Sequence, residues 1–122
     1  MGTIIRMPDQ RIVLVRRAIE PGYGRWVFPS GYVDRGEHIH VAALREAKEE
    51  SGLDVAIDGL VNIYSYAGSA PVIIVYATSV IEGQLACDDE GLEVRFFPPS
   101  EIPWDNLAFK STREALHEFL KI

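Results

Sequence analysis

The sequence contains a single cysteine, Cys87, among 122 residues, so no intramolecular disulfide can form. We therefore expect a reduced, cytoplasmic setting. No apolar run approaches the roughly 20 residues that a membrane-spanning helix needs. Met1 and Gly2 are not followed by a signal-peptide pattern. These absences exclude a small disulfide-stapled fold and predict that the protein does not contact a membrane.

Basic residues are also scarce, with 12 Lys and Arg against 18 Asp and Glu, which gives a net charge of −6. An acidic chain lacks the positive surface that non-specific nucleic-acid binding requires, so we expect no nucleic-acid partner. Hydrophobic residues make up 48% of the chain, enough for a real core. The length fits one compact domain over residues 1–122, with no repeat, linker or low-complexity tract.

Alternating apolar segments and turn residues predict an α/β fold with strands between two helices. The first helix is predicted over residues 40–51, with Gly52 as a left-handed C-terminal cap. Ser111 to Glu114 predicts a capping box that opens a closing helix, with Ala115, Leu116, Phe119 and Leu120 facing inward. Extended segments are predicted at 1–5, 12–15, 25–28, 54–57, 60–66, 71–81 and 92–97.

Three glutamates stand near the end of the predicted helix 40–51. Glu46 and Glu50 are four residues apart, so their side chains share one face, about 5–6 Å between Cβ atoms, with Glu49 on the flank. Like charges at this spacing destabilise a bare helix, and their place near its C-terminus opposes the macrodipole. A solvated acidic face is one interpretation, and a divalent cation that offsets the repulsion is the other. Oxygen ligands without a local His or Cys partner predict Mg²⁺ or Mn²⁺ rather than Zn²⁺.

The spacing of the surrounding residues favours the metal site. Gly31 is followed after five residues by Glu37, and after seven more by the run from Arg45 to Leu53. The pattern G-x(5)-E-x(7)-R-E-U-x-E-E-x-G-U, with U apolar, resembles the signature of the Nudix hydrolases at every specified position. Seven specified residues match by chance in roughly one window in a hundred million. The resemblance covers nearly the whole chain and implies the Nudix fold, a mixed β-sheet sandwiched between α-helices.

Roles for individual residues follow from this resemblance. It implies metal binding by Glu46, Glu49, Glu50 and the backbone carbonyl of Ser30. Arg45 and Glu37 are expected to form an ion pair that orients these ligands. Gly31, Glu37 and Gly52 complete the motif, and Glu46, Glu49 and Arg45 are also predicted to act in catalysis.

The general base has two candidate positions. Glu46 is one, and a carboxylate in a downstream loop is the other. Glu90, in the segment Cys87 to Gly91, is the best match there, with Glu93 and Asp89 as alternatives.

Two departures from the family bear on the site. Ser30 stands where Nudix proteins usually carry Gly, and Ser cannot take positive φ as cheaply, so a left-handed backbone there would strain the loop. His38 and His40 stand where acidic residues are common. We expect both to be exposed rather than to bind metal.

The implied reaction is divalent-metal-dependent hydrolysis of a nucleoside diphosphate linked to another group, by attack of water on the pyrophosphate. ADP-ribose or a related nucleotide sugar is the favoured substrate. A nucleoside triphosphate, including an oxidised one, is the alternative, and a non-catalytic nucleotide-binding domain stays open; an isoprenoid diphosphate isomerase is disfavoured by the short chain. Arg17, Arg25 and Tyr66 are the candidate substrate-binding residues. The sequence does not determine the oligomeric state, and the resemblance leaves a homodimer open, since homodimers are frequent among Nudix proteins.

Overall fold

The computed structural model describes residues 1–68 and 71–121. Six strands form one mixed sheet in the order β3-β2-β1-β5-β4, with β6 also paired to β2. The elements are β1 (Gly2–Arg6), β2 (Ile12–Arg17), β3 (Trp26–Val27), α1 (Ile39–Ser51), β4 (Leu53–Tyr64), β5 (Ile73–Gly83), β6 (Gly91–Phe97) and α2 (Lys110–Leu120). Short 3₁₀ turns, Pro99–Glu101 and Trp104–Asn106, precede α2.

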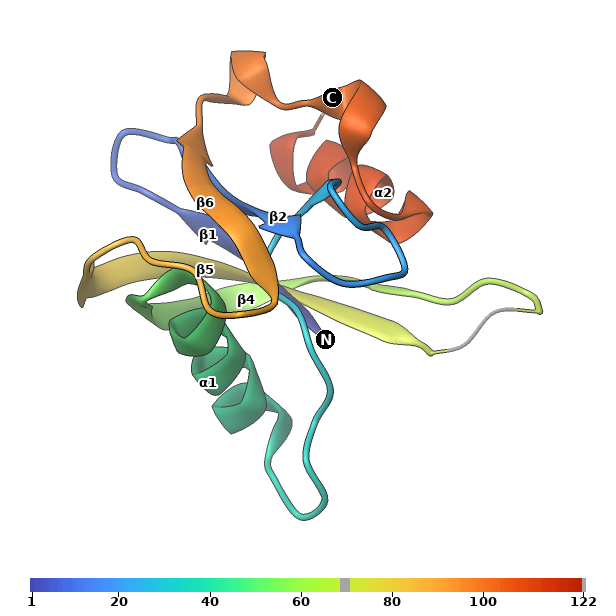
Figure 1. Cartoon of the computed structure of the whole chain (residues 1–122). Helices are drawn as coiled ribbons and strands as arrows, with labels where there is room; N and C mark the ends of the chain where they lie inside the picture. The colour runs from blue at the N-terminus through green and yellow to red at the C-terminus, as the bar shows by residue number, and fades with distance from the viewer. Residues whose placement is uncertain (69–70, 122) are drawn as a thin grey trace.

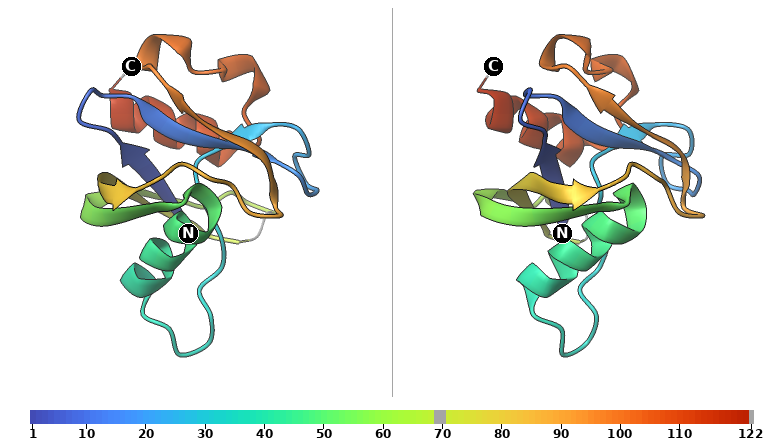
Figure 2. Two further views of the ribbon diagram at one scale, coloured as in Figure 1. Left: turned by 60° about the vertical axis from the view of Figure 1, so that its left-hand side comes forward. Right: turned by 90° about the vertical axis from the view of Figure 1, so that its left-hand side faces the viewer.

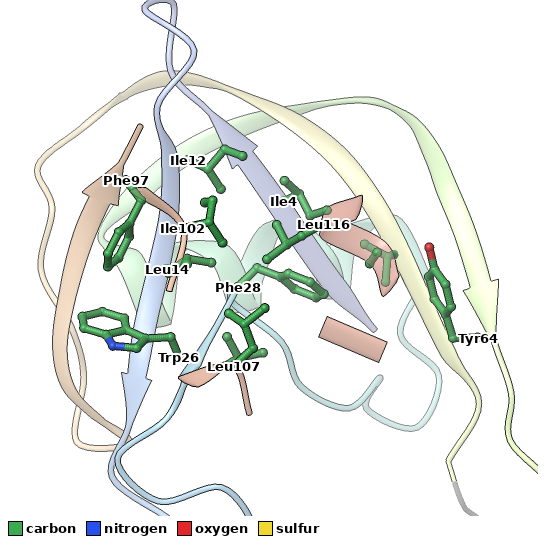
Figure 3. Packing of buried hydrophobic residues seen from close by; sticks show 13 residues of the cluster. Ile4, Ile12, Leu14, Trp26, Phe28, Tyr64, Phe97, Ile102, Leu107 and Leu116 are labelled. Carbon is green, nitrogen blue, oxygen red and sulfur yellow. The ribbon is translucent and has the colours of Figure 1, made fainter. Parts of the chain in front are cut away.

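The two helices lie on opposite sides of the sheet, α1 below and α2 above in Figures 1 and 2. Strand alternation divides the apolar side chains between the two sides. Ile4 packs in a core with Leu116 of α2, and Ile5 packs with Ala47 of α1. Figure 3 shows the larger core, in which Phe28 lies among residues of β1, β2 and α2. The predicted mixed sheet between helices is confirmed.

The β1 strand is the centre of this sheet. It runs parallel to β5, with Gly2 opposite Val75, and antiparallel to β2. Met1 continues the pairing onto the motif loop, since its carbonyl accepts from the Gly31 N–H at 3.0 Å. The motif loop is therefore fixed at the end of the sheet where β1 begins.

The predicted capping box of α2 is wrong. The helix begins at Lys110 with Phe109 at the N-cap, and no side chain caps it. Ser111 and Thr112 are buried inside the first turn instead, because their side chains point at the core rather than back along the backbone. Glu114 accepts a hydrogen bond from the Tyr66 hydroxyl at 2.7 Å. Tertiary packing thus overrides a local signal, although Phe119 and Leu120 do pack against the core as predicted.

The segments predicted as separate strands at 54–57 and 60–66 form one strand, β4. Its pairing with β5 shifts register between Asp54 and Val55, between Ile57 and Gly59, and between Leu60 and Asn62. Such bulges admit Gly59 without ending the strand. Tyr66 lies beyond the end of β4. No helix in the described part of the chain is long and apolar enough to cross a membrane.

Candidate active site

The motif loop is held by an ion pair between Glu37 and Arg45. Arg45 donates from Nε to Glu37 Oε2 at 2.8 Å and from Nη2 to Oε1 at 2.9 Å, the bidentate geometry that favours Arg. Glu37 also accepts from the Asp34 N–H at 3.0 Å. These bonds, led by the guanidinium, lower the pKa of Glu37 to about 2. The ion pair predicted from the sequence is thus present, and it ties the loop to α1.

Arg45 also contacts two of the three helix glutamates. Its Nη1 lies 2.9 Å from Glu46 Oε1 and 3.3 Å from Glu49 Oε2. The pKa of Arg45 is raised, with the Glu37 hydrogen bonds as the largest cause. The guanidinium therefore stays charged, and it fixes the rotamer of Glu46 from one side.

Gly31 is required by close approach. A Cβ at Gly31 would lie 2.4 Å from Glu46 Cδ and within 2.6 Å of both carboxylate oxygens. No positive φ is involved at this position. Any other residue would push the Glu46 carboxylate out of its place. The first glycine of the motif thus provides the space for that carboxylate against the backbone.

Glu50 is the most buried acidic side chain of the site, with 6% of its surface exposed. Its Oε2 accepts from the Ser30 N–H at 2.8 Å. Burial, together with the charges of Glu46 and Asp88, raises the pKa of Glu50 to about 9 against the lowering effect of the Ser30 hydrogen bond. Burial likewise raises the pKa of Glu46, against the opposing effect of Arg45. In the metal-free protein these surroundings favour the protonated forms of both carboxyl groups.

Ser30 does not carry the strain that a left-handed backbone would impose. Within residues 1–68 and 71–121, the non-glycine residues with positive φ are Gln10 and Lys121. Ser30 pairs with Gly2 in an isolated antiparallel bridge, which requires extended backbone. The Ser30 N–H points to Glu50, so this residue contributes to the site whether or not its carbonyl binds metal.

The downstream loop approaches Glu50 through Asp88. The Ala86 N–H donates to the Ser51 carbonyl at 2.9 Å, which ties this loop to the end of α1. Gly52 caps the helix there, with φ of 79°, as predicted. Asp88 is half-buried and raises the pKa of Glu50 through its charge. Sequence reasoning did not single out Asp88, although it belongs to the same acidic run as Glu90.

The other carboxylates of that loop lie elsewhere. Glu90 and Asp89 are exposed. The Glu90 N–H donates to Asp88 Oδ1 at 3.0 Å, and Glu93 is 3.4 Å from Arg16 Nη1. These contacts favour Asp88 over Glu93 as the loop carboxylate nearest to the helix glutamates. His38 and His40 are exposed as predicted, and His38 Nδ1 caps α1 by accepting from the His40 N–H at 3.1 Å.

The candidate metal ligands lie near one another, but they are not arranged in the geometry of a bound metal. Among the described residues, no group of three or more His, Cys, Asp and Glu side chains has the geometry of a metal site. Oxygens of Glu46 and Glu50 are bonded to Arg45 and to the Ser30 N–H, and the side chain of Glu49 is 50% exposed. The donor set nonetheless fits a hard divalent cation, because such an ion would favour the ionised form of carboxyl groups whose pKa values burial has raised.

Two of the three candidate substrate residues contact the start of α2. The Arg17 guanidinium lies 5.1 Å from the centre of the Phe109 ring, and Lys110 Nζ lies 4.9 Å from the centre of the Tyr66 ring. Phe109 and Lys110 are consecutive, so Arg17 and Tyr66 both approach the start of α2. Arg25 is exposed in the loop before β3. Nothing in the sequence except its charge indicated that Lys110 would lie beside a candidate substrate residue.

Comparison with known proteins decides the family. A family model described as NUDIX domain matches residues 1–119. The chain belongs to the Nudix family. The ADP-ribose pyrophosphatase of Methanocaldococcus jannaschii is 35% identical over 105 residues, which are 83% of this chain and 61% of that protein. A putative 8-oxo-dGTP diphosphatase of Bacillus subtilis is 30% identical over 82% of this chain and 66% of its own length.

Solved structures of Nudix hydrolases have the same fold as this chain. A NUDIX hydrolase from Nitrosomonas europaea superimposes with a TM-score of 0.86 and 28% identity, covering 98% of this chain and 70% of that one. The chain thus has the Nudix fold, and Nudix hydrolases generally use divalent metal ions. The chain spans less than two thirds of the Methanocaldococcus relative.

Proposed function

We propose that this Nudix protein hydrolyses a nucleoside diphosphate linked to another group, with ADP-ribose or a related nucleotide sugar as the favoured substrate. The observation that carries the proposal is the pair of α1 carboxylates, part-buried Glu46 and buried Glu50, held against Gly31 and Ser30. A surplus of buried negative charge is costly unless it serves to bind a cation.

The cation we propose is Mg²⁺ or Mn²⁺, held by Glu46, Glu49, Glu50 and the carbonyl of Ser30. Such an ion lowers the pKa of the attacking water and neutralises phosphate oxygens. Arg45 would keep Glu46 in place, and the Ser30 N–H would keep Glu50 in place. Loss of either contact would disorder a ligand without removing it.

For the general base we propose a carboxylate that lies close to Glu46 and Glu50 in the structure. Glu46 is one candidate. In the downstream loop, Asp88 acts on Glu50 through its charge, whereas Glu90 is exposed. Glu90 stays a prediction from the resemblance, with Asp88 as its competitor. A pH–rate profile of Asp88→Asn against Glu90→Gln decides between them, since loss of the base removes the acidic limb.

For the rest of the substrate we propose the surface at the start of α2. Arg17 and Lys110 supply positive charge beside the aromatic rings of Phe109 and Tyr66. Charge next to aromatic faces suits a phosphorylated sugar joined to a nucleobase. Arg25 is the third candidate, exposed in the loop before β3.

A substrate panel tests this proposal. We expect ADP-ribose to yield AMP and ribose 5-phosphate with Mg²⁺, and EDTA to abolish the release. The similarity to the Bacillus protein favours a second candidate, hydrolysis of a nucleoside triphosphate to the monophosphate and pyrophosphate. Preference for triphosphates by kcat/KM would select that alternative, and tight binding without turnover would refute both. We also propose a cytoplasmic location, consistent with the single free thiol of Cys87.

A further inference from the structure

The N-terminus of α2 lacks the side-chain acceptor that usually caps a helix. Phe109 stands at the N-cap position with extended backbone, and no side chain of the described residues caps the first turn. The first bond within the helix runs from the Arg113 N–H to the Phe109 carbonyl at 3.2 Å. The N–H groups of residues 110–112 precede that bond and have no acceptor inside the helix. The first turn carries no acidic side chain, so the partial positive charge of this helix end has no counter-charge there.

A buried hydroxyl without a partner lies in the same turn. Thr112 is 1% exposed, and within residues 1–68 and 71–121 its Oγ1 has no hydrogen-bond partner. Thr112 is the third residue of α2, and its Cβ, on the core side of the helix, tilts toward the helix N-terminus as every helical Cβ does. An unpaired buried hydroxyl is costly, so this group points to a ligand acceptor at the start of α2.

Two cations flank this end of the helix. Lys110 is the first helical residue, and its Nζ lies 4.9 Å from the centre of the Tyr66 ring and 3.9 Å from Glu114 Oε1. Glu114 does not serve Lys110 alone, because its Oε2 accepts from the Tyr66 hydroxyl at 2.7 Å. The Arg17 guanidinium lies 5.1 Å from the centre of the Phe109 ring. Basic side chains beside open helix N–H groups make a site suited to an anion.

One extended segment of chain separates this site from the motif loop. Leu107 forms a parallel bridge with Trp26, and the Ala108 N–H donates to the Trp26 carbonyl at 2.8 Å. Trp26 stands four residues before Ser30, which corresponds to about 13 Å of extended chain. A ligand whose diphosphate lies at the proposed cation site would therefore reach α2 with a different group.

We propose that the N-terminus of α2, with Lys110, Arg17 and the Thr112 hydroxyl, binds a phosphate group other than the diphosphate that is cleaved. Phosphate fits because it accepts several hydrogen bonds and carries the charge that a helix N-terminus favours. Its source is either a phosphate monoester on the nucleoside ribose of the substrate or a free phosphate ion. The first source rests on the proposed function, and the second does not.

Phosphate binding is tested on the full chain in EDTA, where no cation can hold phosphate at α1. Inorganic phosphate is titrated to about 50 mM at constant ionic strength while the amide NMR signals are followed. We expect the largest shifts at residues 110–112, and binding at least about threefold weaker in Lys110→Gln and in Arg17→Gln. The matched control is Lys121→Gln, which removes the same charge at the exposed C-cap of α2. This variant should bind phosphate as the parent does.

Thr112→Val separates a binding role of the hydroxyl from core packing. Valine has nearly the same shape, so the variant should keep or exceed the Tm of the parent while binding phosphate at least about threefold more weakly. Unchanged phosphate affinity in Thr112→Val or in Lys110→Gln overturns the assignment. An absence of shifts at residues 110–112 in the parent overturns it as well.

The two sources are distinguished by matched nucleotides that differ by one phosphate monoester. ADP-ribose is compared with its 2′-phosphate and its 3′-phosphate by the same titration in EDTA. A phosphate carried by the substrate predicts a Kd about tenfold lower for one of the two phosphates, and loss of that preference in Lys110→Gln. Equal Kd values, with inorganic phosphate still shifting residues 110–112, assign the site to the free ion. Because these measurements need no turnover, a failure to hydrolyse ADP-ribose would refute the proposed function without changing their result.

Discussion

The two helices each carry a pair of glutamates four residues apart, but their surroundings shift glutamate pKa values in opposite directions. On α2, Glu114 and Glu118 accept hydrogen bonds from the hydroxyls of Tyr66 and Tyr64. The Tyr64 bond lowers the pKa of Glu118. On α1, burial raises the pKa of Glu46, and it raises that of Glu50 to about 9.

The difference lies in the donors that surround each pair. On α2, phenol groups neutral at ordinary pH satisfy carboxylates that remain close to water, and burial together with Glu114 raises the pKa of Tyr66 to about 12. On α1, a buried pair has too few donors for its charge. The same spacing is therefore satisfied by neutral donors in one helix and serves the proposed cation in the other, and the surroundings make the difference.

Replacing one glutamate in each pair should separate the two roles most strongly. We expect Glu50→Gln to lose about a thousandfold in kcat/KM, about 4 kcal/mol of transition-state stabilisation, because it removes a proposed cation ligand. Glu118→Gln should stay within about threefold of the parent, since only tyrosine and asparagine contacts change. Steady-state kinetics with saturating Mg²⁺ measures both. A Glu50→Gln enzyme within tenfold of the parent would refute the ligand assignment.

Metal should stabilise the protein through the α1 pair. An ion at a hundredfold its Kd adds about 2.7 kcal/mol, which corresponds to a rise in Tm of about 5–10 °C for a chain of this size. We expect this rise in the parent and in Glu118→Gln, and its loss in Glu46→Gln combined with Glu50→Gln. Thermal melts across a millimolar Mg²⁺ titration measure it, and an unchanged parent Tm speaks against the site.

The pH dependence of stability should differ in sign between the pairs. The folded-state pKa of Glu50 is raised from 4.5 to about 9, so metal-free protein loses stability as pH rises through that interval. The lowered pKa of Glu118 gives stability that is present at higher pH and lost as pH falls below its unfolded value of 4.5. Glu50→Gln should therefore flatten the alkaline decline of Tm in EDTA, and Glu118→Gln should not. An alkaline decline that survives Glu50→Gln would locate the cause elsewhere.

The smallest effect belongs to the phenols of the α2 pair. Tyr64→Phe removes one hydrogen bond to Glu118 and should lower Tm by about 2–5 °C. Because the bond lies on the α2 side, Mg²⁺ should raise the Tm of this variant as much as that of the parent. A loss of the Mg²⁺ effect in Tyr64→Phe would show that the two pairs are coupled.

The sequence predicts the α1 side of this comparison well, because the motif is local. Glu46 and Glu50 share a helix face by periodicity alone, and the Arg45–Glu37 pair follows from their spacing to the loop. The need for glycine at position 31 was predicted, but its cause, the Glu46 carboxylate against the backbone, is visible only in three dimensions.

Long-range contacts account for what the sequence could not predict. Asp88 approaches Glu50 because the Ala86–Ser51 bond folds its loop onto α1. Glu114 looked like a capping residue, yet the burial of Ser111 and Thr112 turned it toward Tyr66. Neither contact leaves a short-range pattern.

The central claim is that Glu46 and Glu50 bind a divalent cation beside Ser30 and Gly31. Anomalous scattering from a crystal soaked in Mn²⁺ tests it most directly. The account predicts a peak within about 2.0–2.2 Å of oxygens from both glutamates, with Arg45 still on Glu37. A peak at other residues, or none while both side chains turn to solvent, would contradict it.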